Sequence, residues 1–228
     1  MFRNSGFYFI LLLFVVLIGF WSSYFSRWLT DIDAYTHFHA ISMLLWLGLL
    51  ITQALLIRYK KNSLHRMAGK LSYLLVPVLI VSLVLLAHYQ IVIEDGVVPS
   101  FRRYILFLQL SLLCLFVIAY GLAIVYRHQP ARHARYMITT AFTLIDPAVA
   151  RIPLGIPDLP FRYQVLTFAL TDLLIILMIV FERKQTKGRE VLPVMLAIFV
   201  FFQWLNLNWT NSDVWTDFSN WFAGLPLT

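Results

Sequence analysis

The chain has 228 residues, of which 61% are hydrophobic and only 13% are charged, whereas about 25% of the residues of an average soluble domain are charged. This composition excludes an ordinary soluble protein and predicts an integral membrane protein. The formal net charge of +7 does not indicate nucleic-acid binding, because most basic residues lie in short connections between apolar stretches. The single cysteine, Cys114, excludes an intramolecular disulfide.

Seven apolar stretches, some marginal in length, qualify as membrane-spanning helices, which need roughly 20 mostly apolar residues. In chain order they cover residues 7–25, 36–57, 71–93, 104–126, 136–152, 164–181 and 191–207. Because nothing remains for a soluble domain, we expect an all-α, polytopic membrane helical bundle that forms one transmembrane domain over residues 1–228. The aromatic-rich tail, residues 207–228, is expected to lie along the outer surface.

The basic residues predict how the bundle is oriented. Most of the 18 lysines and arginines lie at Arg3 and in the alternate connections 58–70, 127–135 and 183–189. The positive-inside rule assigns these connections to the cytoplasmic side. We therefore expect a cytoplasmic N-terminus, an outside C-terminus, a location in the inner (cytoplasmic) membrane of the cell, and the lipid bilayer as a partner.

Two histidines open the second predicted helix in the stretch THFHA, residues 36–40. Residues two apart on a helix point about 200° away from each other, so His37 and His39 do not share a face. His39 heads a stripe of polar or amphipathic residues at helical spacing, which suggests that it points inward. The other members of this stripe are Ser42, Trp46 and Gln53.

The third predicted helix carries His88 about five residues before its outer end. His39 and His88 are expected at a similar depth, roughly 5–8 Å below the membrane boundary, on sequential antiparallel helices. A matching inward stripe is expected on the third helix. It runs from His88 back through Val81, Pro77, Tyr73 and Lys70.

These histidines leave several chemistries open. They can be hydrogen-bonded interfacial residues, ligands of a cofactor, or members of a proton relay. A zinc, copper or iron ion would use His39 and His88 with His37 or an outer carboxylate as a further ligand, whereas haem b would need only two facing imidazoles. At the cytoplasmic side, His65 and His133 are the corresponding candidates for a second cofactor.

Charged residues within the predicted spans form another candidate site. Asp146 and Arg151 lie in the fifth stretch and Asp172 lies in the sixth. An ionised carboxylate near the middle of a bilayer costs about 3 kcal/mol or more unless it is paired or protonated. We therefore expect Arg151 to bridge one or both aspartates, either as a structural ion cluster or as part of a transport path.

The second and third predicted helices carry a recognisable pattern of residues. The pattern is a histidine that opens one helix, a glutamine late in it, an arginine in the loop, and then LHRMAGKLSY at residues 64–73. The matching positions are His39, Gln53, Arg58, His65, Arg66, Gly69, Lys70 and Tyr73. Over these roughly 60 residues the chain resembles an uncharacterised family of bacterial multi-pass membrane proteins, a domain of unknown function, which implies a membrane bundle and no particular activity.

A looser similarity connects the chain to cytochrome-b561-like proteins, which bind haem between histidines on antiparallel helices. That resemblance implies a haem held by His39 and His88. The predicted helices four, five and six carry no histidine near their middle, unlike a two-haem electron path.

Three functions follow as hypotheses. The leading one is a membrane protein with a metal or haem site near its outer face, in redox chemistry or metal handling. The second is a transporter or proton-coupled binding protein that uses Asp146, Arg151 and Asp172. The third is an accessory or assembly subunit that docks a membrane-protein partner, or a second copy of itself, through the aromatic tail.

Overall fold

The computed structural model describes residues 5–30, 32–94, 96–152 and 160–228. Within these ranges the chain is helical, as the sequence predicts. The helices are α1 (Ser5–Gly19), η1 (Phe25–Arg27), α2 (Ala34–Arg58), α3 (Asn62–Gly69), α4 (Ser72–Gln90), α5 (Ser100–Val125), α6 (Pro130–Phe142), α7 (Ile145–Val149), α8 (Pro160–Phe181), α9 (Val191–Asn208) and α10 (Asp213–Ala223).

Five helical segments in the described part of the chain are long and apolar enough to cross a membrane. They are Ala34–Arg58, Asn62–Gln90, Ser100–Val125, Tyr163–Phe181 and Val191–Asn208. The other two expected spans form shorter elements. The stretch 7–25 yields α1, whose 15 residues reach only about 22 Å at 1.5 Å per residue, and the stretch 136–152 is divided between α6 and α7.

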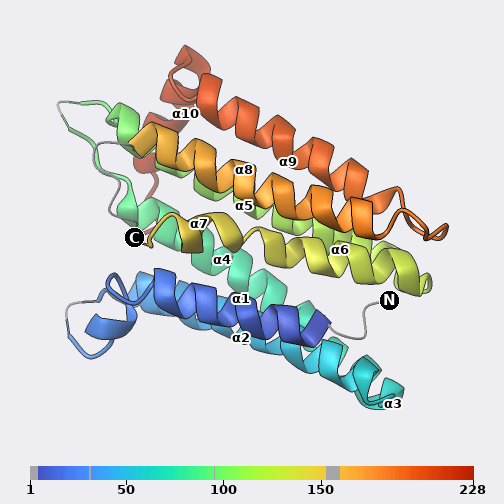
Figure 1. The fold of residues 1–228 in the computed structure, drawn as a ribbon. Coiled ribbons are helices and arrows are strands. Elements are labelled where there is room, and N and C mark those ends of the chain that lie inside the picture. Colours follow the sequence, from blue (N-terminus) through green and yellow to red (C-terminus); the bar gives the residue numbers. More distant parts are fainter. Residues whose placement is uncertain (1–4, 31, 95, 153–159) are drawn as a thin grey trace.

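The helices run alongside one another, and their connections gather at two ends (Figure 1). One end, here called the basic end, holds α3, the start of α6 and the connection between α8 and α9. Residues 58–70, 127–135 and 183–189, which form this end, carry 12 of the 18 lysines and arginines. The opposite end holds η1, α10 and the C-terminal residues (Figure 1).

The interior is built from two groups of helices. In the first group, α1, α2 and α4 pack around the fully buried residues Trp46, Leu47 and Leu79. In the second group, α5, α6, α8 and α9 pack around Ile175 and Met195. The α6–α7 segment connects the groups, because α6 packs against α5 and α9 whereas α7 packs against α1 and α8.

The contact between α1 and α7 requires a glycine. Gly19 lies directly against the backbone of Ala148, and a Cβ atom at position 19 would be 2.8 Å from the carbonyl carbon of Ala148. Real Cβ contacts are essentially never shorter than 3.0 Å. The missing side chain of Gly19 therefore sets how closely α7 approaches the first group of helices.

The aromatic tail packs back on its own chain. Trp215 and Phe222 of α10 are buried in a cluster with Leu106 and Phe107 of α5, and the indole Nε1 of Trp215 donates to the carbonyl of Arg103 at 3.0 Å. Only part of the tail's aromatic surface, such as Trp221, remains exposed.

A buried ion pair ties α6 to the end of α8 at the basic end. The side chain of Arg135 has no exposed surface, and its Nε lies 2.6 Å from a carboxylate oxygen of Glu182. Arg135 also donates through Nη1 to the carbonyls of Ala131 and Lys187. These contacts hold the connection that precedes α9 against α6.

Candidate functional site

The helix that the sequence predicts over residues 136–152 is discontinuous. It stops at Phe142 and resumes at Ile145 as the short α7. Pro147 has no N–H group, so the carbonyl four residues earlier, that of Thr143, loses its helical partner. Before the break, three threonine hydroxyls donate to the carbonyls three residues earlier, which competes with regular helical bonding. These are Thr139 (2.8 Å), Thr140 (2.6 Å) and Thr143 (2.8 Å).

A cavity of about 380 Å³ lies beside this break, between α1, α2, α4, α5 and α7. We call it the main cavity. Its polar lining residues are Ser23, Tyr24, Asp33, Thr36, His39, Gln90, Gln109, Thr143 and Arg151. Its apolar lining includes Met43, Leu47, Leu79, Leu83, Leu112 and Phe116. The volume falls within the range of about 300–1,000 Å³ that is typical of small-molecule sites.

The main cavity changes character along its length. On α2 its lining runs from Thr36 to Leu47, a rise of about 16 Å. The polar residues lie toward the end opposite the basic end, where Gln109 donates to Gln90 at 2.9 Å. The deeper walls are leucine and methionine on α2 and α4 and Phe116 on α5. This arrangement suits an amphiphile whose polar head lies near the mouth and whose apolar part extends toward the middle of the bundle.

Arg151 supplies a positive charge to the main cavity. Its Nη1 donates to the carbonyl of Pro147 at 2.8 Å, and its guanidinium lies 4.5 Å from the centre of the Phe20 ring. It forms no ion pair with any of the described residues, where the pairs are Arg132–Glu190 and Arg135–Glu182. The side chain remains accessible. It is therefore available to an anionic group inside the cavity.

His39 lines the same cavity, and the hydrogen bonds around it define its tautomer. The Ser82 hydroxyl donates to the carbonyl of Leu79 at 2.8 Å, so its oxygen accepts from Nδ1–H of His39 at 3.1 Å. In the neutral ring the lone pair then lies on Nε2.

The expected bridge between Arg151 and the aspartates is wrong. Oδ1 of Asp146 accepts from Nε2 of Gln164 at 2.6 Å and from the hydroxyl of Thr167. Asp172 accepts from Nε2 of Gln203 at 3.1 Å. Asp146 lies within α7 and bonds to α8. Arg151 lies two residues beyond the end of α7 and lines the main cavity instead.

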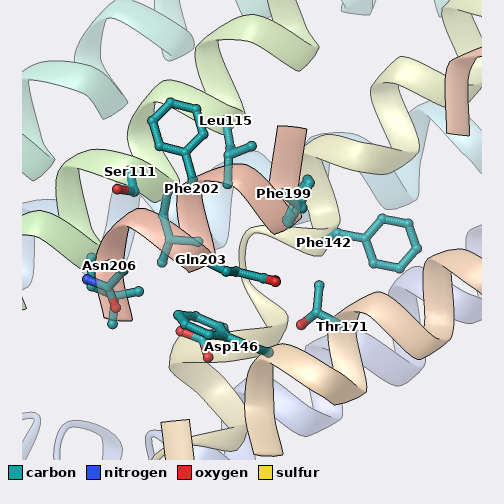
Figure 2. A pocket seen from close by; sticks show the side chains of 12 residues that line it. Ser111, Leu115, Phe142, Asp146, Thr171, Phe199, Phe202, Gln203 and Asn206 are labelled. Atoms are coloured by element: carbon teal, nitrogen blue, oxygen red, sulfur yellow. The ribbon is translucent and has the colours of Figure 1, made fainter. Parts of the chain in front are cut away.

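Asp146 borders a second, much smaller cavity between α5, α7, α8 and α9 (Figure 2). Its volume is about 20 Å³, enough for a single water molecule. Figure 2 shows Asp146 at this cavity together with Thr171, Gln203 and Asn206. Oδ2 of Asp146 and Oδ1 of Asn206 are buried and have no hydrogen-bond partner among the described residues. α7 therefore separates this small cavity on one side from the main cavity on the other.

The three outer histidines do not converge. Nδ1 of His37 lies 3.0 Å from the hydroxyl of Tyr24, whereas Nδ1 of His88 lies 2.6 Å from that of Thr228. His39 instead meets α4 at Ser82, six residues before His88, which corresponds to about 9 Å along the helix and about 120° around it. Across the described ranges, no group of three or more histidine, cysteine, aspartate or glutamate side chains is placed to hold a metal.

The polar stripe on α2 is buried, whereas its expected counterpart on α4 is not. Ser42, Trp46 and Gln53 are at most 9% exposed, so the helical spacing correctly predicts the inner face of α2. On α3 and α4 the residues that were expected to continue the stripe of His88 lie on the exposed face. They are Lys70, Tyr73, Pro77 and Val81.

The structure brings His65 and His133 together at the basic end, with their ring centres 6.5 Å apart. Nδ1–H of His133 donates to the carbonyl of Ala123 at 2.8 Å. With its amide in the orientation that satisfies both neighbours, Gln53 donates to Nδ1 and to the carbonyl of His65 and accepts from the backbone N–H of Gly69. Neutral His65 thus carries its proton on Nε2, and neutral His133 has its lone pair there. Such a pair suits a proton relay better than two metal ligands.

Several residues in or next to the main cavity are absent from the sequence-based candidates. Gln90 and Gln109 meet across α4 and α5, and Ser82 orients His39. Each is a polar residue within a predicted apolar span, which is the available signal in the sequence, because polar side chains in such spans normally face protein or water.

Comparison with known proteins adds no relative. No family model, curated protein or solved structure matches this chain.

Proposed function

We propose that this chain is a polytopic membrane protein that binds a small amphiphile with an anionic head group in the main cavity and carries it between the membrane and one of its faces. The observation that supports this most strongly is the position of Arg151. A guanidinium without an ion pair among the described residues lies on the wall of an otherwise largely apolar cavity, next to a discontinuous helix. Broken helices beside a ligand site are a recurrent feature of secondary transporters.

We further propose that α1 and the α6–α7 segment complete a set of seven membrane segments together with the five longer helices. The basic end then faces the cytoplasm of a cell with an inner membrane, as the positive-inside rule requires. This orientation gives a cytoplasmic N-terminus and an outside C-terminus. The polar mouth of the main cavity then lies near the outer face.

The charges at the mouth favour an anion over a cation. Asp33 also lines the cavity, but its carboxylate accepts from the backbone N–H and the hydroxyl of Thr36 as the N-cap of α2. Arg151 donates one hydrogen bond to a backbone carbonyl and keeps further N–H groups for a ligand. A carboxylate, sulfonate or phosphate head therefore finds its charge partner at Arg151, with the imidazole of His39 near it.

The experiment is a binding titration of the purified protein in nanodiscs with octanesulfonate, whose head group stays charged over the working pH range. We expect saturable binding that is lost in Arg151→Gln and retained in Arg103→Gln. Arg103 is the matched control, because it lies outside the main cavity and donates to the carbonyl of Val98 and to Asn211. Equal binding by an octyltrimethylammonium cation, or unchanged binding in Arg151→Gln, would refute the proposal.

Metal or haem binding is a second candidate function, and one observation favours it. In neutral His39 the lone pair lies on Nε2, and Nδ1–H is held by Ser82, which is the arrangement that most metal-binding histidines adopt. His39 would then be the sole protein ligand from the outer histidines. An optical spectrum and elemental analysis of the purified protein test this. A Soret band, or stoichiometric zinc, copper or iron, that is lost in His39→Ala would establish it, and the absence of both would remove it.

A further inference from the structure

We propose that Asp146 is a proton-binding site coupled to the main cavity, so that the protein takes up a proton at Asp146 when an anionic ligand binds at Arg151. This inference rests on the proposed function for the identity of the ligand. The coupling itself concerns two residues of α7 and its C-terminal turn, and it is testable without a ligand.

Asp146 lies in a buried environment formed by neutral side chains. Its side chain is 2% exposed, and the hydrogen bonds to Oδ1 come from the neutral side chains of Gln164 and Thr167 on α8. Oδ2 is buried without a partner among the described residues. A buried charge is costly unless it is paired, whereas a protonated carboxyl places a donor on the second oxygen. A cavity of about 20 Å³ lies beside Asp146.

The positive charge of Arg151 acts on Asp146 from the other side of α7. Asp146 and Arg151 form no direct ion pair, but they lie only five residues apart in the chain, and opposite charges attract strongly inside a protein. α5 presents the buried hydroxyl of Tyr104, which has no hydrogen-bond partner among the described residues. α9 presents Gln203 and Asn206, and Phe20, which follows α1, places its ring beneath Arg151. Arg151 is therefore the cation among these groups that supports the ionised form of Asp146.

An anion bound at Arg151 changes the protonation equilibrium of Asp146. An anionic head group at Arg151 neutralises the guanidinium and removes its support for the carboxylate. Asp146 then binds a proton from the solvent more readily. Because coupling between two binding sites is reciprocal, the proton at Asp146 also increases the affinity for the anion. The anion and the proton each favour the binding of the other, so one negative charge enters the bundle together with one proton.

The ligand-free test follows the carboxyl of Asp146 by infrared spectroscopy, with Asp146→Asn used to assign the band. In Arg151→Gln, which imitates the neutralised guanidinium, we expect the midpoint of the Asp146 titration to move to higher pH. An unchanged midpoint would overturn the coupling whether or not any ligand binds. Asp172→Asn is the matched carboxylate control, because Asp172 bonds to Gln203 away from Arg151, and it should leave the midpoint unchanged.

The ligand test measures proton uptake with a pH-sensitive dye in weakly buffered nanodiscs while octanesulfonate is added. We expect proton uptake with each binding event, and about fivefold or more tighter binding at acidic than at alkaline pH. Both effects should vanish in Asp146→Asn. As a control, a thermal unfolding curve of Asp146→Asn should show the cooperative transition of a folded protein.

His39 is the competing proton site, because its imidazole lines the same cavity as Arg151. His39→Gln should bind the sulfonate more weakly but take up the same number of protons per ligand bound. Loss of uptake in His39→Gln, or its persistence in Asp146→Asn, would overturn the assignment to Asp146. If octanesulfonate does not bind but Arg151→Gln still moves the midpoint, the coupling stands and the proposed ligand is wrong.

Discussion

The packing of α1 on α7 predicts that Gly19→Ala destabilises the protein. The new Cβ would lie 2.8 Å from the carbonyl carbon of Ala148 and closer still to its oxygen. Because this neighbour is backbone, no side chain can turn aside, and α1 and α7 must separate. Overpacking of this kind costs about 1–3 kcal/mol. A cost of about 2 kcal/mol corresponds to a fall in Tm of about 4–8 °C for a chain of this size.

Gly48→Ala is the matched control for this prediction. Gly48 lies within α2, and a Cβ there would have no neighbour within 4 Å. Replacing an unstrained helical glycine by alanine stabilises by up to about 1 kcal/mol, so Tm should rise by about 2–4 °C. Thermal unfolding of both variants in one detergent, followed by circular dichroism, gives the comparison. Equal shifts of Tm, or a more stable Gly19→Ala protein, would refute the close contact between α1 and α7.

Three further predictions concern the ion pairs and the main cavity. Glu182→Gln should cost about 3 kcal/mol, because Arg135 is fully buried, whereas Glu190→Gln should change Tm little, since its pair with Arg132 is exposed. Its own backbone N–H and the Arg132 guanidinium lower the pKa of Glu190. The small contribution of that pair should therefore be present above the ordinary glutamate pKa of about 4.3, and melting curves should show its loss as the pH falls through the lowered value. Ala40→Phe should fill part of the main cavity and weaken octanesulfonate binding about tenfold, or about 1.4 kcal/mol, without lowering Tm.

Local patterns in the sequence predict the helices and the inner face of α2. Trp46 and Gln53 recur with the helical period, and both are buried. Pro147 likewise indicates a break, because the missing N–H acts within one turn of helix. The number of long helices is less predictable from hydropathy. A break of two residues is enough to divide one apolar stretch into α6 and α7.

Contacts between distant residues explain what the sequence does not predict. His88 was expected to face His39, yet its partner is Thr228, 140 residues away. No periodicity within α4 encodes that contact. The expected bridge from Arg151 to Asp146 fails for a different reason. Both residues belong to one apolar stretch, but the direction of each side chain depends on how α7 is rotated after the break.

At the basic end, the sequence motif predicts only part of the group of residues that the structure brings together. The motif of the resemblance contains both Gln53 and His65, and the structure places the glutamine amide on that imidazole. The neighbour of His65 in space is His133 on α6. The sequence offers both histidines as candidates on the same side of the membrane. The orientation of their nitrogens depends on Gln53 and on the carbonyl of Ala123.

The central claim is that the main cavity holds an anionic amphiphile, and the most direct test is an experimental structure with a bromine-labelled alkyl sulfonate. The account predicts the sulfonate at Arg151 and His39, with the bromine at the apolar end of the cavity near Met43 and Phe116. A label found only on the lipid-facing surface, or a cavity that stays empty at saturating sulfonate, would contradict it.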